Sequence, residues 1–384
     1  MVDFTFNTAR TIINQRGGVT QTGKLVRDMG YSRVLVVADR GILQAGHLDT
    51  LTQSITSQGL ECYSFHEVGP DPTETMVLEA TALARQHQVE CIIGIGGGSV
   101  MDVAKAASAL AKPGSCLEEI YGINQIKFGR LPLILVPTTA GTGSEVTASS
   151  VISHVSGKKN VAIDPILCPD IALLDVELLS TMPRHIATTT GVDAIVHAIE
   201  AYTSTTKKNP ISDMLACEAL RLLTRNLSLS IQENAPVEIR SNVLLGSMLA
   251  GQAFTNSSVS AVHAFAYALA EKYHLPHGLS NSLVLIAILK FNIATSPAVY
   301  GKLGKAVYSE SLELTDNEAA DYFVAQLENL LQGIELHKKL REFGVTRQDL
   351  PLLAEATSVM ERLLNNNPRT IDYDAALQIF SDAF

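Results

Sequence analysis

The first half of the chain alternates between two hydrophobic periods. Short runs of branched apolar residues at 33–38 (RVLVVA), 62–65, 91–95 and 131–136 have the length and composition of buried strands. Longer segments with helical spacing, at 42–58 and 73–88, separate these runs. Strands that alternate with helices of this length favour βαβ crossovers and a mostly parallel sheet. The pattern therefore predicts an α/β region.

The second half is helical in period almost throughout. Apolar positions recur three and four residues apart at 190–202, 211–226, 237–255, 261–273 and 280–291. Pro183 suits the first turn of a helix and marks the change in character. We predict an α/β domain over residues 1–183 and an all-helical domain over residues 184–384. Since no flexible linker separates them, we expect them to pack directly and form a cleft.

Composition and charge restrict the function. The 384 residues suffice for two cores, and 46% hydrophobic against 18% charged residues argues against disorder. A net charge of −10 without a dense basic run argues against a nucleic-acid partner. The N-terminus lacks a basic region followed by an apolar one, and no apolar run reaches about 18 residues. We expect a cytoplasmic protein with no membrane partner.

A glycine cluster follows the run at 91–95 and precedes a helical segment. Gly97, Gly98 and Ser99 allow a ligand to approach the backbone closely, and the free N–H groups of a helix start favour a diphosphate. Ser99 stands where the usual Rossmann fingerprint has its third glycine. A purely structural turn between strand and helix is the alternative.

A second polar loop follows the run at 131–136. It offers the hydroxyl groups of Thr138, Thr139, Thr142 and Ser144 at the end of a buried strand, where open α/β sheets bind ligands. Its alternative is an ordinary polar turn. Asp39 ends the strand at 33–38, where a carboxylate binds ribose hydroxyls and repels a 2′-phosphate, which favours NAD over NADP. The alternative for this acid is an N-cap.

Three histidines and one aspartate in apolar helical segments form a candidate metal site. Asp193 and His197 are four residues apart, so one helix face presents both. His263 and His277 flank a further helical segment. Three imidazoles and a carboxylate suit Zn²⁺ or Fe²⁺.

Each of these residues also has a structural interpretation. Asp193 reads as the end of a capping box that begins at Thr190, and a buried histidine is often satisfied by its neighbours in a core. His274 lies in the same loop as His277 and competes with it.

Four ordered motifs resemble the iron-containing (group III) alcohol dehydrogenase family. They are GGGSVMDVAKA, PTTAGTGSEVT, GVDAIVHAIEAY and HAFAYALAEKYHLPHGLSN. The likeness also includes VVADRG, GPDPT and NNPRT, so it extends over nearly the whole chain.

The resemblance implies a Rossmann-like dinucleotide-binding domain and an all-α domain, which is the dehydroquinate synthase-like fold. It implies an NAD-linked alcohol dehydrogenase that interconverts alcohols with aldehydes or ketones, uses Fe²⁺, Zn²⁺ or another divalent ion as a Lewis acid, and forms a homodimer. It implies Asp193, His197, His263 and His277 as metal ligands, and Phe254 in the substrate pocket. The implied cofactor contacts are Asp39, Asp71, Gly97, Gly98, Ser99, Thr138, Thr139, Thr142, Ser144, Lys159 and Leu179.

One position departs from the family pattern. Many members have a histidine four residues after the third metal ligand, and this chain has Tyr267 there. A tyrosine donates a hydrogen bond, but its ordinary pKa of about 10 makes it a poor base at neutral pH. We expect this residue to alter the substrate range or the proton path more than the reaction type.

Three other functions compete with this one. A glycerol-dehydrogenase-like polyol enzyme would keep zinc and NAD. A lyase resembling dehydroquinate synthase would need a cluster of Lys and Arg for phosphate, which the segment between Asp193 and His277 does not show. A binding or scaffolding protein without catalysis would not need all four candidate ligands.

Overall fold

The computed structural model describes residues 3–154 and 159–384. The chain divides into two compact units, one from Asn7 to Met182 and the other from Pro183 to Phe384 together with the first residues. These units are defined by internal packing and carry no information about which ligand each of them binds. The functional domains at 1–183 and 184–384, and the cleft expected between them, therefore stay predictions.

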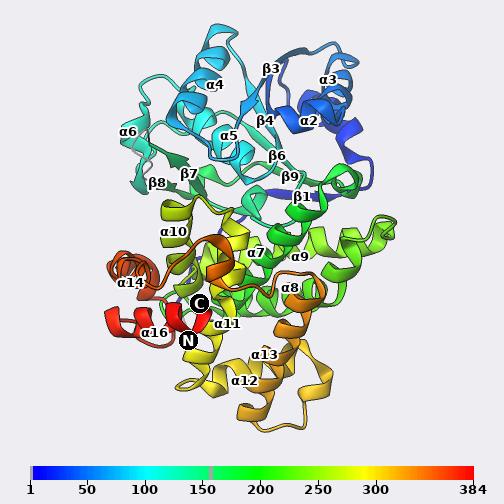
Figure 1. Ribbon diagram of the computed structural model, residues 1–384. Coiled ribbons are helices and arrows are strands. Elements are labelled where there is room, and N and C mark those ends of the chain that lie inside the picture. The colour runs from blue at the N-terminus through cyan, green and yellow to red at the C-terminus, as the bar shows by residue number, and fades with distance from the viewer. Residues whose placement is uncertain (1–2, 155–158) are drawn as a thin grey trace. The chain divides into compact units, whose positions relative to one another are not determined.

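The first unit is built on a parallel sheet. Within the described residues this sheet has six strands in the order β1-β9-β6-β4-β2-β3 (Figure 1). Its strands are β1 (Thr11–Asn14), β2 (Arg33–Asp39), β3 (Glu61–Val68), β4 (Cys91–Gly96), β6 (Leu133–Pro137) and β9 (Ile171–Leu174). Its helices are α1 (Thr22–Asp28), α2 (Arg40–Gln44), α3 (His47–Thr56), α4 (Glu74–Gln86), α5 (Gly98–Leu110) and α6 (Leu117–Ile120). The predicted parallel α/β fold is confirmed.

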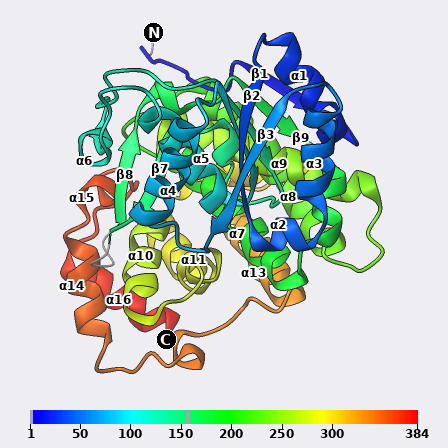
Figure 2. The same ribbon diagram turned by 90° about the horizontal axis from the view of Figure 1, so that it is seen from above.

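Both faces of this sheet are buried because successive side chains of a strand point to opposite sides. In β2, Leu35 and Val37 pack with α4 and α5, whereas Val34 and Val36 pack with α1 and α3. Figure 2 shows the two pairs of helices on opposite sides of β2 and β3. The continuous apolar run at 33–38 is therefore explained by a strand that is covered on both faces.

The sequence did not predict several elements of this unit. The segment expected as one helix at 42–58 is two helices, α2 and α3, because Gly46 adopts a left-handed φ of 75° between them. β1 is half exposed and has no buried apolar run, so its pattern gave no strand signal. A small second sheet pairs β5 (Gly122–Ile123), β8 (Lys159–Ile163) and β7 (Ser149–Ser153).

The second unit is helical, as predicted. Its helices are α7 (Arg184–Thr203), α8 (Pro210–Ser230), α9 (Val237–Ser257), α10 (Ala261–Tyr273), α11 (His277–Ile293), α12 (Pro297–Val307), α13 (Asp316–Gly333), α14 (Leu350–Ser358), α15 (Glu361–Leu364) and α16 (Tyr373–Ala383). Every residue of α7 from Gly191 to Ala201 is buried. Since a helix that is buried all round lies inside a core, α7 is the central helix of this unit.

Helix α7 begins earlier than the sequence suggested. The capping box proposed for Thr190 and Asp193 is wrong, because Arg184 starts the helix and Pro183 is its N-cap. The hydroxyl of Thr190 instead donates to the carbonyl oxygen of Ile186 at 2.8 Å. Asp193 therefore lies in the middle of the helix, and its carboxylate is not used as a cap.

Within the described ranges, no single helix has both the length and the apolar character needed to cross a bilayer. Helices α11 and α12 meet this criterion only as a pair, and they are bent by 120° at the break between them.

Candidate functional site

The glycine cluster lies between a buried strand and a long helix. Strand β4 ends at Gly96, and α5 begins at Gly98. Gly97 is the N-cap and has an extended backbone, with ψ of −173°. The first N–H groups of a helix have no partner within it, and glycine leaves them open to a ligand. This arrangement suits an anion such as a diphosphate.

The threonine loop lies directly beside the glycine cluster. Strands β4 and β6 are neighbours, with Gly96 paired to Pro137. A Cβ atom built on Gly98 would lie 2.8 Å from Cγ2 of Thr142, and one built on Gly97 would lie 3.5 Å from Cγ2 of Thr139. The structure therefore brings the two predicted loops together at the carboxyl ends of adjacent strands.

Asp39 lies at the point where the sheet changes direction. From β2 the chain goes outward to β3, whereas from the neighbouring β4 it goes to β6 on the other side. Ligands of open α/β sheets bind outside the carboxyl ends of strands at such a switch point. Asp39 also caps α2, because its Oδ1 accepts a 2.9 Å hydrogen bond from the amide of Ile42. The structural interpretation of Asp39 is thus confirmed, and its ribose contact stays a prediction.

Ser144 belongs to a buried network beneath the threonine loop. Its hydroxyl donates to Oδ1 of Asp102 and accepts from Nζ of Lys105, both at 2.9 Å. Lys105 also donates to Oγ1 of Thr147 and to the carbonyl oxygen of Ser149. Burial lowers the pKa of Lys105 although Asp102 opposes the shift, and burial raises the pKa of Asp102 although Lys105 opposes it. This network supports the loop from inside.

The remaining predicted cofactor contacts also belong to the first unit. Nζ of Lys159 forms a 2.7 Å ion pair with Oδ1 of Asp71. The hydroxyl of Ser99 donates to the carbonyl oxygen of Pro70, next to Asp71. Thr138 is buried, and its amide donates to the carbonyl oxygen of Gly96 at 3.0 Å. Leu179 is buried in the 3₁₀ helix Val176–Thr181.

Three of the four candidate metal ligands, Asp193, His263 and His277, form one cluster in the helical unit, and His197 lies beside Asp193 without being part of that cluster. Oδ1 of Asp193 lies 3.8 Å from Nε2 of His197, 3.8 Å from Nε2 of His263 and 3.5 Å from Nε2 of His277. The ligand atoms of Asp193, His263 and His277 all lie within 4.8 Å of one another. Tetrahedral ligands on bonds of about 2.1 Å are about 3.4 Å apart. The separations from Asp193 are close to that value.

The chemistry of these donors also fits a cation. Nε2 of His263 is buried and has no hydrogen-bond partner among the described residues. Burial raises the pKa of Asp193, and His277 and His263 oppose this shift without cancelling it. Burial lowers the pKa of His263, but Glu200 and Asp193 outweigh it and the net shift is upward. Both groups therefore hold a proton more readily than they would in water.

The structure distinguishes between the two histidines of the loop before α11. His277 is the first residue of α11, and its side chain is 37% exposed. His274 is the C-cap of α10, with a left-handed φ of 53°. Like His197, it is not part of the cluster of Asp193, His263 and His277, and, unlike His197, it forms no ion pair with Asp193 among the described residues. His277 therefore exposes the candidate site to solvent.

Phe254, predicted to lie in the substrate pocket, and Tyr267, which departs from the family pattern, both have rings against this cluster. The ring of Phe254 stacks on His197 with centroids 4.3 Å apart. The ring of Tyr267 stacks on His277 at 5.5 Å and meets the edge of His263 at 6.2 Å. The aromatic rings of Phe254 and Tyr267 thus pack against the imidazoles of the candidate ligands.

Two residues that the sequence analysis did not single out also belong to this cluster. Nδ2 of Asn281 donates a 2.7 Å hydrogen bond to Oδ1 of Asp193. Oε2 of Glu200 lies 2.6 Å from Nδ1 of His263. Helical spacing could have found both residues. Asn281 follows His277 by four residues and Glu200 follows Asp193 by seven, so each lies on the same helix face as a candidate ligand.

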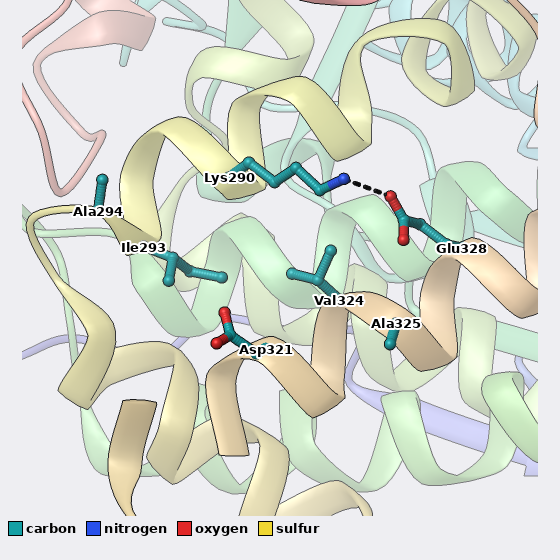
Figure 3. A pocket seen from close by; sticks show the side chains of 7 residues that line it. All are labelled: Lys290, Ile293, Ala294, Asp321, Val324, Ala325 and Glu328. Carbon is teal, nitrogen blue, oxygen red and sulfur yellow. Dashed lines mark hydrogen bonds and ion pairs between the residues drawn. The ribbon is translucent and has the colours of Figure 1, made fainter. Parts of the chain in front are cut away.

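A separate groove of about 390 Å³ lies between α11 and α13. Figure 3 shows Lys290 and Glu328 pointing toward each other across it, and their charged atoms are 2.6 Å apart. Its other lining residues are Ile293, Ala294, Asp321, Val324 and Ala325. None of these is a predicted site residue, so this groove is separate from the candidate metal centre.

Comparison with known proteins gives matches over nearly the whole chain. The profile of the family described as iron-containing alcohol dehydrogenase matches residues 9–176. The C-terminal profile of the Fe-containing alcohol dehydrogenase family matches residues 187–384. The resemblance seen in the four sequence motifs is confirmed.

Named relatives agree with these profiles. A long-chain-alcohol dehydrogenase of Geobacillus thermodenitrificans is 34% identical over 355 residues, which cover 92% of this chain and 89% of the relative. The crystal structure of a 1,3-propanediol oxidoreductase matches with a TM-score of 0.95 and 29% identity over 100% of both chains. A sulfoacetaldehyde reductase of Bifidobacterium kashiwanohense, solved with NAD⁺, matches with a TM-score of 0.91 and 25% identity over 100% of this chain and 99% of that one. The predicted fold class is confirmed.

Proposed function

Since the chain belongs to the iron-containing alcohol dehydrogenase family, we propose that it interconverts alcohols with aldehydes or ketones, using NAD and a divalent cation held by Asp193, His197, His263 and His277. The observation that carries the cation site is the buried Nε2 of His263, which lies beside Asp193 without a hydrogen-bond partner among the described residues. A buried nitrogen of this kind is costly unless it meets a proton or a cation.

When bound, Fe²⁺ or Zn²⁺ would act as a Lewis acid on the substrate oxygen. The protein holds the ligands for it in place. Asp193 and His197 are fixed by the buried helix α7, and His263 comes from α10. His277 is partly exposed, so the site can be reached from solvent. A set of three nitrogens and one oxygen suits both metals.

In the first unit the two loops bind the dinucleotide, which accepts or donates the hydride. The first amides of α5 and the hydroxyls of Thr139 and Thr142 would hold the diphosphate. Asp39 holds the ribose hydroxyls and repels a 2′-phosphate, so NAD is preferred over NADP. These contacts orient the cofactor.

Side chains near the candidate cation site line the proposed substrate pocket. The rings of Phe254 and Tyr267 exclude water beside the imidazoles of His197 and His277. Tyr267 lies where many family members have a histidine, and its ring stacks on His277, so its hydroxyl would offer a hydrogen bond on the substrate side of the site. The glycerol-dehydrogenase-like and lyase alternatives are not favoured, because the matching family profiles are those of the iron-containing alcohol dehydrogenases.

The proposal also includes the cellular location, the oligomeric state and the partners of the protein. We expect a cytoplasmic homodimer that has no nucleic-acid or membrane partner. Residues 1–183 would bind NAD, and residues 184–384 would hold the cation.

The test is metal removal and reconstitution. Protein treated with a chelator should lose NAD-linked turnover over a panel of alcohols and aldehydes, and addition of Fe²⁺ or Zn²⁺ should restore it. The matched control is Glu328→Gln, which removes an ion pair in the separate groove between α11 and α13 and should leave metal dependence unchanged. Full activity in the chelated protein, or no NAD-linked activity with any metal, would overturn the proposal.

A further inference from the structure

Glu200 is a buried carboxylate with four hydrogen-bond donors around it. Its Oε1 accepts from the amide of Val262 at 2.6 Å and from Oγ of Ser260 at 3.0 Å. Its Oε2 accepts from the amide of Ser260 at 2.8 Å and lies 2.6 Å from Nδ1 of His263. The side chain is 3% exposed. An ionised carboxylate has about four acceptor sites, so this set of donors uses them fully.

The contact between Glu200 and His263 determines how the imidazole ring is used. Because an ionised carboxylate only accepts hydrogen bonds, Nδ1 of His263 must carry the hydrogen. In a neutral imidazole the other nitrogen, Nε2, then holds the lone pair. Nε2 lies 3.8 Å from Oδ1 of Asp193. The ring therefore presents its lone pair to the place where the carboxylate and the other imidazoles converge.

The same carboxylate also fixes the backbone that carries His263. Ser260 is the N-cap of α10, and Val262 lies in the first turn of that helix. The first amides of a helix have no partner within it, and Glu200 supplies one from α7. It thus controls both the position of the α10 start and the rotation of the His263 ring about its Cβ–Cγ bond.

We propose that Glu200 is a positioning residue that holds His263 as an Nε2 donor for the divalent cation. This inference rests on the proposed function, because it assigns Glu200 a role toward the cation of that site. A carboxylate that only stabilised the start of α10 would change the stability of the helix and leave cation affinity unaltered. Carboxylates that orient a ligating histidine typically change metal affinity by about 10–100-fold when they are replaced.

Cobalt titration of metal-stripped protein separates these roles without an activity assay. Absorption of bound Co²⁺ should show affinity about 10–100-fold weaker in Glu200→Gln than in the unaltered chain. Glu200→Asp keeps the charge and should recover part of the loss. The matched control is Ser260→Ala, which removes the hydroxyl from the same carboxylate but keeps the amide and the His263 contact. Its affinity for Co²⁺ should stay within about 3-fold.

A second measurement decides the matter even if Glu200→Gln does not fold. In the Zn²⁺-loaded, unaltered chain with ¹⁵N-labelled histidine, NMR should show that His263 keeps its hydrogen on Nδ1 and binds zinc through Nε2. Zinc on Nδ1, or Co²⁺ affinity unchanged in a folded Glu200→Gln variant while His263→Ala has lost it, would overturn the role of Glu200 and leave the proposed function intact. Failure of the unaltered chain to bind Co²⁺ and Zn²⁺ would instead overturn the cation site itself.

Discussion

Gly98 and Thr142 are in contact in a way that only glycine permits. A Cβ atom at position 98 would lie 2.8 Å from Cγ2, 3.1 Å from Oγ1 and 3.2 Å from Cβ of Thr142. Gly98 is the first residue of α5, whereas Thr142 follows β6. The absence of one side chain therefore lets the two proposed diphosphate-binding loops lie against each other.

Gly98→Ala should weaken NADH binding by about 10-fold or more, because the added Cβ atom would push apart the two loops proposed to hold the diphosphate, and overpacking of a close contact typically costs about 1–3 kcal/mol. Fluorescence titration with NADH measures the loss. Thr142→Ser added to Gly98→Ala removes the Cγ2 atom and should recover part of the affinity. Gly333→Ala is the control, since an added Cβ atom meets nothing within 4 Å there. Unchanged affinity in Gly98→Ala would contradict the role of this contact.

Asp39 should control the choice between NAD and NADP. Asp39→Asn removes the charge but keeps an oxygen for the cap contact with the amide of Ile42. We expect the ratio of kcat/KM for NADP to that for NAD to rise about 10-fold or more, because the repulsion of a 2′-phosphate is lost. Asp39→Gly should act in the same direction and cost only a few tenths of a kcal/mol at the cap. A ratio that does not move in either variant would count against the ribose contact.

Tyr267→Phe should lower kcat about 10-fold, which corresponds to the loss of one hydrogen bond to the substrate of about 1.4 kcal/mol. The ring that stacks on His277 remains, so Co²⁺ affinity should not change. Steady-state kinetics with several alcohols, together with the cobalt titration, checks both statements. If kcat were unaffected for every substrate, the tyrosine would act only as a wall of the pocket.

Glu145 should make stability depend on pH. Burial raises the pKa of its carboxyl from 4.5 to about 7, although Lys105 opposes the shift. The folded state therefore keeps the proton longer than the unfolded state, so its contribution to stability is fully present below pH 4.5 and lost as the pH rises through 7. The loss amounts to about 3 kcal/mol.

Glu145→Gln should remove this dependence, because an amide does not ionise. Urea unfolding of both proteins at pH 5 and pH 8 measures it as a difference between variants. The variant should gain stability relative to the parent chain at pH 8 and little at pH 5. An equal difference at both values would show that the carboxyl does not change its protonation in this range.

The apolar pattern was enough to predict the central strands and the helical half. Strand β2 has a continuous run of branched residues because both of its faces are covered, and that run is visible in the sequence. β1 is half exposed, and its strand conformation depends on pairing with the distant β9. Such pairing leaves no local signal, which explains why β1 was not predicted.

The candidate site was visible in part. Asp193 and His197 share a helix, so their spacing alone placed them on one face. That His263 and His277 meet them depends on how α10 and α11 pack against α7, which spacing cannot supply. The reason for glycine at position 98 likewise lies in a residue 44 positions later in the chain.

Helix α7 carries three side chains of the candidate metal centre at fixed angular positions, namely the proposed ligands Asp193 and His197 and the proposed positioning residue Glu200. Each residue of an α-helix advances by about 100° around the axis. Insertion or deletion of a single residue between Asp193 and Glu200 would therefore turn the later side chains away from the earlier ones by that angle. The length of this stretch is therefore constrained as strictly as its composition, a constraint that does not apply to the turn between α8 and α9, which carries none of these side chains.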